Sequence, residues 1–172
     1  MLRAKIICLS ALFVSLPATA HGPAQTETAT ALAADNSTAD RQAILDHGEL
    51  WTSLYERGAF EEMRPLYEPD AWLMTNGAPA AKGVDAILTY LAKSKAEASN
   101  VSFAFEPENI TIDGDYSFLT SKYWMTIKAS SPEPLEIAGR SFLVFKRGND
   151  GKWRIWRDID NQAPDVRIAD KP

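Results

Sequence analysis

The sequence of 172 residues has little of what metal sites and nucleic-acid sites need. Its one cysteine, Cys8, lies near the N-terminus, and its histidines are His21 and His47. A single histidine in the folded part cannot build a zinc site. Neither a glycine-rich phosphate loop nor a nucleophilic serine turn is found. The formal net charge is −5, without a basic run, which argues against nucleic acid or an anionic membrane as partner. We expect no metal and no cofactor.

Residues 1–20 have the organisation of a secretory signal peptide. Arg3 and Lys5 precede a short apolar stretch, residues 6–16, and residues 18–20 read Ala-Thr-Ala, the small-x-small pattern that signal peptidase recognises. The apolar stretch is too short to span a bilayer, which takes roughly 20 residues. We predict an exported protein, periplasmic or secreted. Cleavage would remove the only cysteine, so the mature chain would have no disulfide.

The remaining chain divides by composition into three parts. Residues 21–39 are rich in alanine and threonine and almost free of large apolar side chains, which predicts a flexible linker. Residues 40–164 carry the apolar and aromatic patterns of a packed domain, and residues 165–172 form a short C-terminal tail. The hydrophobic fraction of 45% and the aromatic fraction of 10% suit one globular domain.

The domain is predicted to be α+β. Ile44, Trp51 and Leu54 recur at helical spacing and predict a helix over residues 40–57, which Gly58 can end. Further helices are expected over residues 60–67 and 83–98, and strands over residues 71–75, 101–112, 116–128, 136–146 and 152–160. Because the last four strands are joined by short turns, they should pair antiparallel. Helices would then cover one face of a curved, mostly antiparallel sheet.

Four stretches carry a family resemblance. Residues 51–60 (WTSLYERGAF), 66–71 (LYEPDA), 83–87 (GVDAI) and 151–158 (GKWRIWRD) together resemble the SnoaL-like domains of the nuclear-transport-factor-2-like superfamily. The resemblance implies a cone-shaped domain with a deep apolar pocket. It also implies a choice among activities, since the superfamily includes ketosteroid isomerases, scytalone dehydratase, polyketide cyclases and proteins that only bind ligands or dimerise.

The isomerase branch of this superfamily uses a carboxylate base, a tyrosine and a protonated acid. Aligned on the resemblance, these roles fall on Thr75, Trp51 and near Ser141. None of the three chemical functions is preserved. The alignment therefore argues against ketosteroid-type isomerisation by that set of residues.

The last predicted strand offers another acid-base pair. Asp158 and Asp160 stand two residues apart, about 6.5 Å along a strand. Beneath an apolar roof the two carboxylates would repel, and one pKa could rise into the range of a general base. The alternative is that they are solvated or paired with Arg140 or Arg154. Strict alternation places Trp153, Ile155, Arg157 and Ile159 on one face of this strand and Trp156, Asp158 and Asp160 on the other. The resemblance implies that the face with Asp158 and Asp160 lines the pocket.

His47 lies one helical turn before Trp51 and could point into the same pocket. It would then form a dyad with Asp158 or Asp160, suited to water loss or retro-aldol chemistry, although a satisfied or exposed helix histidine is an open alternative. Arg140 interrupts an apolar strand, and an edge or interface charge is favoured over an anchor for a ligand carboxylate or phenolate. The candidate ligand-binding residues could line a pocket for a flat apolar ligand or simply fill the core: Trp51, Tyr67, Trp72, Met74, Tyr123, Arg140, Ser141 and Trp156.

The sequence thus predicts an exported cavity protein that acts on a small hydrophobic molecule, aromatic or polyketide-like. Cofactor-free acid-base chemistry is favoured, as in a lyase, dehydratase or isomerase, with Asp158, Asp160 and His47 as catalytic candidates. A non-catalytic binder of a hydrophobic ligand is the alternative. A third hypothesis is a dimerisation module, and a homodimer is expected, because the outer face with Trp153, Ile155 and Ile159 is apolar enough to pair.

Overall fold

A computed structural model of the chain describes residues 23–98, 100–128 and 133–172. The predicted signal peptide, with Cys8, lies outside these ranges. The chain divides into two units, Met1–Ala34 and Asp35–Pro172. The first is described only from Pro23 onward and is helical there. The second contains every strand of the described chain.

Three helical segments precede or interrupt the strands. Helix α1 comprises Pro23–Arg57, the 3-10 helix η1 Phe60–Leu66, and helix α2 Val84–Glu97. The predicted linker is therefore helical from Pro23 onward. Proline suits a first helical turn and alanine has the highest helix propensity, so its composition favours this outcome too. α1 ends as predicted: Gly58 has a φ of +71° and its N–H donates to the Tyr55 carbonyl at 3.0 Å.

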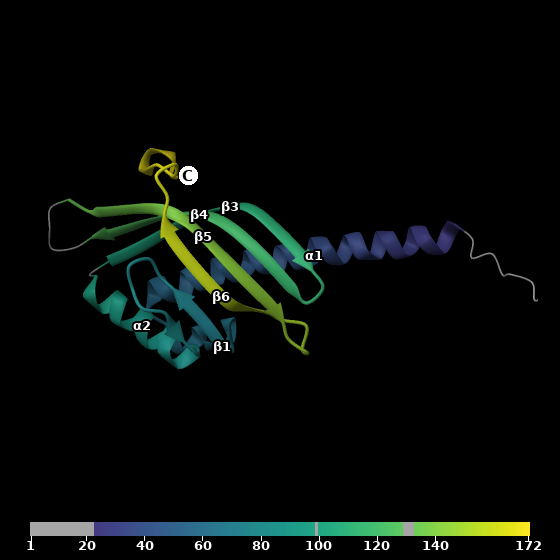
Figure 1. The fold of residues 1–172 in the computed structure, drawn as a ribbon, viewed down its shortest axis with the longest axis horizontal. Coiled ribbons are helices and arrows are strands. Elements are labelled where there is room, and N and C mark those ends of the chain that lie inside the picture. The colour runs from purple at the N-terminus through teal and green to yellow at the C-terminus, as the bar shows by residue number, and fades with distance from the viewer. Residues whose placement is uncertain (1–22, 99, 129–132) are drawn as a thin grey trace, which may run out of the picture. The chain divides into compact units, whose positions relative to one another are not determined.

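Six strands form one mixed sheet in the order β2-β1-β6-β5-β4-β3 (Figure 1). β3 to β6 form the predicted antiparallel meander, and β1 pairs with β6 in parallel. The α+β prediction is thus confirmed, although β1 begins four residues earlier than expected and β2 was not foreseen. The strands comprise Tyr67–Met74 (β1), Ala81–Lys82 (β2), Asn100–Asp113 (β3), Tyr116–Lys128 (β4), Leu135–Arg147 (β5) and Trp153–Gln162 (β6).

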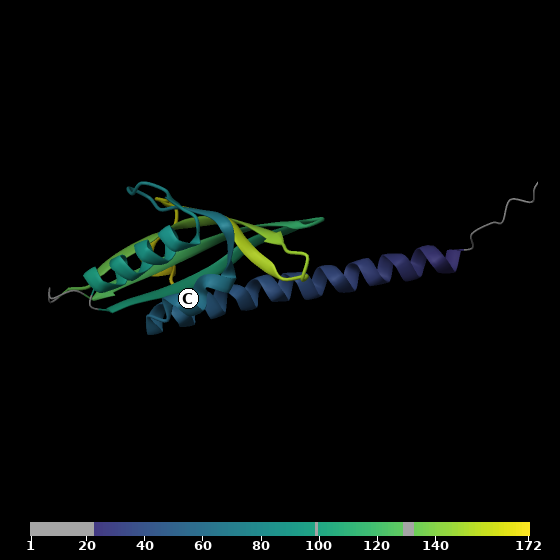
Figure 2. The ribbon, with the colours of Figure 1, turned by 90° about the horizontal axis from the view of Figure 1, so that it is seen from below.

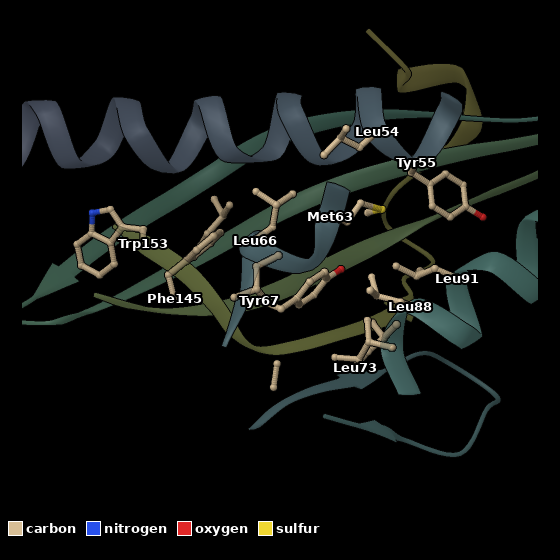
Figure 3. Close-up of a cluster of buried hydrophobic side chains, with 14 of the residues drawn as sticks. Leu54, Tyr55, Met63, Leu66, Tyr67, Leu73, Leu88, Leu91, Phe145 and Trp153 are labelled. Atoms are coloured by element: carbon tan, nitrogen blue, oxygen red, sulfur yellow. The ribbon is translucent and has the colours of Figure 1, made fainter. Parts of the chain in front are cut away.

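The helices of the second unit pack against one face of this curved sheet, as the view in Figure 2 shows for α2. Between the two layers lies an apolar core (Figure 3). Burying each large apolar side chain contributes roughly 1.5–3 kcal/mol. The core draws on three helices and on strands far apart in sequence: Ile44 and Leu54 from α1, Met63 and Leu66 from η1, Ile87, Leu88 and Leu91 from α2, and Tyr67, Leu73, Phe145 and Ile155 from the sheet.

A β-bulge interrupts β6 and changes which of its side chains face the helices. Phe145 on β5 lies opposite Ile155, but the next residue, Val144, lies opposite Arg157, so Trp156 has no partner on β5. An extra residue of this kind reverses the alternation of the side chains that follow. The predicted grouping is therefore wrong for the first half of the strand. Trp153 and Ile155 are buried in the core, and Ile155 shares the cavity face with Asp158 and Asp160.

The C-terminal segment packs onto the sheet. Val166 is buried, and the indole N–H of Trp124 on β4 donates to the Arg167 carbonyl at 2.9 Å. A short 3-10 helix, η2, follows over Ile168–Asp170. In the described ranges, no helix combines the length and the apolar character needed to cross a membrane.

Candidate functional site

A cavity of about 1010 Å³ lies between α1, α2 and the sheet face that the helices cover. Its volume is at the upper end of the range for small-molecule sites. Side chains from α1, α2, β1 and the meander β3–β6 line it, and most are aliphatic or aromatic. The predicted site residues that line this cavity are His47, Trp51, Tyr123, Ser141, Asp158 and Asp160.

Asp158 presents a carboxylate that has no partner among the described residues. Its neighbours across the sheet are Leu73 on β1 and Leu143 on β5, and both leucines also line the cavity. No hydrogen bond or ion pair reaches the carboxylate from the described part of the chain. Removal from water, and secondarily the charge of Asp160, raises the pKa of Asp158 to about 7. At neutral pH the group can therefore both accept and return a proton.

Asp160 sits in a different environment two residues further along β6. Its Oδ1 accepts a hydrogen bond from the backbone N–H of Asn76 at 3.2 Å, and the Thr75 side chain bonds to it as well. Removal from water raises the pKa of Asp160, while these two bonds oppose the rise. Hydrogen bonds to a carboxylate favour its ionised form. Asp160 thus acts as the fixed charge beside Asp158, and the turn at Thr75 and Asn76 orients it.

The predicted ion-pair partners of these carboxylates are bound elsewhere. Arg140 contacts Glu108 at 2.8 Å and Asp165 at 2.7 Å. It lies on β5, an inner strand of the sheet, and does not line the cavity, so it is neither a charge on an edge strand nor an anchor for a ligand in the cavity. Arg154 contacts Asp150 at 2.6 Å. Neither arginine neutralises Asp158 or Asp160.

Tyr67 lies behind the cavity wall and contacts Trp51. It is almost fully buried, and its hydroxyl oxygen accepts a hydrogen bond from the Trp51 indole N–H at 2.6 Å. Burial and the nearby charge of Asp158 raise the Tyr67 pKa, so the hydroxyl keeps its proton. Tyr67 was predicted to bind ligand, but it does not line the cavity. Its role is to hold the indole of Trp51 in place.

His47 lines the cavity without forming the predicted dyad. Its ring packs edge-on against Phe145, 5.1 Å between centroids, and it is 7% exposed. Removal from water lowers its pKa to about 4, so the imidazole is neutral at pH 7. Within the described residues Nε2 has no hydrogen-bond partner, and neither Asp158 nor Asp160 contacts the ring. The structure thus contradicts the His–Asp dyad.

Three other predicted ligand-binding residues lie outside the cavity. Ala71 and Leu73 turn inward on β1, so Trp72 and Met74 face the opposite side, where Lys82 lies 4.0 Å above the Trp72 ring. The bulge places Trp156 on that side too. Its indole N–H donates to Asp70 at 3.2 Å, and Arg157 stacks on its ring at 3.9 Å. The predictions for these three residues are therefore wrong.

Aromatic residues that the sequence analysis did not select form much of the cavity wall. Tyr55 stacks on Trp51 with centroids 5.3 Å apart, and Phe103 stacks on Phe105 at 5.7 Å. The two pairs meet edge to face, with Trp51 and Phe103 at 5.7 Å. Their spacing in the sequence, four residues on a helix and two on a strand, is the signal that they share a face. Such walls suit a flat apolar ligand.

No group of three or more histidine, cysteine, aspartate and glutamate side chains in the described ranges is arranged to hold a metal ion. The chemistry that these residues themselves can perform is proton transfer by a carboxylate in an apolar, aromatic cavity.

Comparison with known proteins gives a consistent fold. Residues 36–158 match the family model of the SnoaL-like domain. An NTF2-like protein with a cystatin-like fold from Novosphingobium aromaticivorans superposes with a TM-score of 0.68 at 21% identity, over 81% of this chain and 92% of that one. A ketosteroid isomerase-like protein from Erwinia carotovora atroseptica gives 0.60 at 21% identity, over 72% and 96%. A candidate scytalone dehydratase from Novosphingobium aromaticivorans gives 0.66 at 17%, over 76% and 88%. No curated protein matches the sequence.

Proposed function

The chain belongs to the SnoaL-like domain family, and we propose that it moves a proton on a small, largely apolar molecule bound in its cavity, without a cofactor. Isomerisation, dehydration and related lyase reactions are the reaction types that need this step. The observation that carries the proposal is the Asp158 carboxylate, which has no partner in the described ranges and whose pKa is raised to about 7 inside an aromatic cavity. Structural neighbours described as ketosteroid isomerase-like and as a candidate scytalone dehydratase are compatible with it.

In this mechanism the ionised Asp158 removes a proton from an activated carbon of the ligand and becomes a neutral acid. It then returns the proton to another position, which isomerises the ligand, or to a leaving hydroxyl group, which releases water. Burial keeps the pKa of Asp158 high, and Asp160 supports this cycle because its charge adds to the rise. The aromatic walls hold the ligand next to Asp158.

Deuterium exchange tests the proposal directly. The protein is incubated in D₂O with a panel of enolisable aromatic ketones and aromatic diols, and mass spectrometry follows deuterium uptake or loss of water. We expect turnover by the wild type and a loss of at least about 100-fold in Asp158→Asn, as for removal of a general base. Asp113→Asn, an exposed carboxylate at the end of β3, is the matched control. Full activity of Asp158→Asn would contradict the mechanism.

The pH dependence separates the two carboxylates. In the wild type the rate should rise as the pH passes through about 7, because the base must be ionised. Asp160→Asn removes the charge that contributes to the raised pKa of Asp158, so its profile should keep its shape but move to lower pH. If the profile does not move, Asp160 has no electrostatic influence on the base. Ligand binding without turnover by any compound would support a non-catalytic binder.

We also propose that the protein is exported and forms a homodimer. Export is supported by the signal-peptide pattern of residues 1–20, and mass analysis of the protein from culture supernatant or periplasm would locate the cleavage expected before His21. The dimer is supported by the outer sheet face, where Phe118 stacks on Phe142 at 6.3 Å and where Phe142 and Ile159 are 42% and 45% exposed. Light scattering should show a dimer for the wild type and a monomer for Phe142→Asp.

A further inference from the structure

A row of oxygen-bearing side chains crosses the cavity wall on three adjacent strands. Ser121 on β4 lies opposite Ser141 on β5, and Ser141 lies opposite Asp160 on β6. All three line the cavity. Side chains directly opposite one another have Cβ atoms about 4.5–5.5 Å apart, so a single ligand group can reach two of them. We call Ser121, Ser141 and Asp160 the acceptor row.

The unpaired hydroxyl of Ser141 is an independent observation that indicates ligand binding at the acceptor row. Its side chain is 6% exposed, and its Oγ has no hydrogen-bond partner in the described part of the protein. Leaving a buried hydroxyl unpaired costs about 1–3 kcal/mol, so such groups are rare and need an explanation. Because Ser141 borders the cavity, a rotation of its side chain would bring Oγ to a bound molecule that provides the missing partner.

The row offers acceptors and negative charge to that molecule. The Asp160 carboxylate can only accept hydrogen bonds when it is ionised, and its bonds to Asn76 and Thr75 leave further lone pairs for a ligand. Among the described residues, Arg57 is the only arginine or lysine of the cavity lining, and it is exposed. A carboxylate or phosphate on the ligand would therefore meet like charge, whereas a hydroxyl or ammonium group would find acceptors.

The distance along the strands between Asp158 and the acceptor row restricts the shape of the ligand. Asp158 lies level with Leu143 and Leu119 on the neighbouring strands, so the reacting carboxylate has apolar surroundings. The acceptor row lies two residues further along, about 6.5 Å away. Beyond it, the Tyr123 ring covers Gly139, where a Cβ would come within 2.9 Å of that ring. The cavity thus has an apolar part around Asp158, where the reaction takes place, and a polar part at the acceptor row, where the ligand is recognised.

We propose that the acceptor row binds a hydrogen-bond-donating group, a hydroxyl or a protonated amine, on an aromatic ligand, and that the cavity rejects ligands that carry a carboxylate. The inference rests on the proposed function only in taking this cavity as the ligand site. It adds the substrate class: an aromatic body with a donor group about 6–7 Å from the reacting atom.

Calorimetric titration with four matched compounds tests the proposal at pH 7.5. They are 2-methylnaphthalene, 2-naphthalenemethanol, protonated 2-(aminomethyl)naphthalene and 2-naphthoate. One hydrogen bond is worth about 1 kcal/mol, so the alcohol or the ammonium compound should bind about 5–10-fold more tightly than the methyl compound. The naphthoate should bind least. A preference for ammonium over alcohol identifies the Asp160 charge as the main attraction, and the reverse identifies the serines.

Two serine variants decide whether the row is responsible. Ser141→Ala should reduce the advantage of the donor compounds, and that of the alcohol most, and should leave the affinity for 2-methylnaphthalene unchanged. Ser117→Ala is the matched control, because Ser117 is also buried and unpartnered on β4 but does not line the cavity. Urea unfolding checks that both variants fold, and Ser141→Ala should be no less stable than the wild type.

Several results would overturn the inference. These are equal binding of the methyl and donor compounds, tightest binding of 2-naphthoate, no binding of any of the four, or equal effects of the two serine variants. Because the titration measures binding without turnover, its outcome is independent of the deuterium exchange that tests Asp158. A cavity that binds donors but exchanges no deuterium would retain the acceptor row and refute only the catalytic proposal.

Discussion

Replacing Asp158 by asparagine should make the folded protein more stable at pH 8 and leave its stability unchanged at pH 4. The carboxyl has an ordinary pKa of 3.8 in the unfolded chain, and burial raises it to about 7 in the folded protein. The folded state therefore binds this proton more tightly than the unfolded state does. Stability contributed by the group is fully present below pH 4 and is lost as the pH rises to about 7.

The magnitude follows from the same two values. Each pKa unit corresponds to 1.36 kcal/mol, so a rise from 3.8 to about 7 costs about 4 kcal/mol once the group is ionised in both states. Water that enters the cavity screens part of this cost. We therefore expect Asp158→Asn to exceed the wild type by about 2–4 kcal/mol at pH 8. Asparagine has nearly the same shape but no charge, so packing should change little.

Urea unfolding at pH 4, 6 and 8 measures the difference between wild type and variant. Taking the difference at each pH removes the contributions of the other titrating groups, and Asp113→Asn, on an exposed strand end, controls for the loss of one negative charge. A difference that stays constant across the three pH values would refute the reasoning. So would a less stable Asp158→Asn at pH 8, since it would mean that the charged form is favoured in the folded protein.

Three further substitutions test the fold around the site. Gly139→Ala should destabilise the protein by about 3 kcal/mol or more in thermal unfolding, because the new Cβ would lie 2.0 Å from the Asn161 carbonyl oxygen; an unchanged melting temperature would contradict this placement. Gly48→Ala should stabilise the protein by about 0.5–1 kcal/mol, since Gly48 lies within α1 with no atom within 4 Å of its added Cβ; destabilisation would be the opposite result. Asp40→Asn should cost about 1–3 kcal/mol at pH 7, because Arg147 binds the ionised carboxylate and lowers its pKa. That cost should disappear in urea unfolding as the pH falls through the lowered pKa, and a cost that persists in acid would exclude the ion pair as its source.

Much of the secondary structure could be predicted because its signals are local. Apolar side chains at helical spacing and glycine-containing turns marked the end of α1, both ends of α2 and the four long strands to within a few residues. The start of α1 at Pro23 was missed, because residues 23–39 lack the apolar side chains that reveal helical spacing. The start of β1 was missed because it depends on a distant partner: Tyr67 is extended opposite Ile155 on β6. Because β1 and β6 pair in parallel, no short turn joins them, and the sequence therefore contains no local signal for this pairing.

The candidate site could be predicted only in part. The spacing of Asp158 and Asp160 indicated that both side chains share one face of β6, which is correct. Extending the same alternation back to Trp156 failed, because the bulge inserts that residue without a partner on β5. Trp72, Met74 and the His47 dyad failed for a related reason: the direction of a side chain depends on the neighbours that surround it.

The sequence by itself determined the family, the α+β class, the order of the elements and the two carboxylates on the last strand, since periodicity and motifs are properties of consecutive residues. Only the tertiary structure decided which β6 side chains face the helices, that Arg140 and Arg154 bind other carboxylates, and that no described residue pairs with Asp158 in the cavity. These features depend on strand register and on the desolvation of a group by distant segments, and both arise when the sheet and helices pack together.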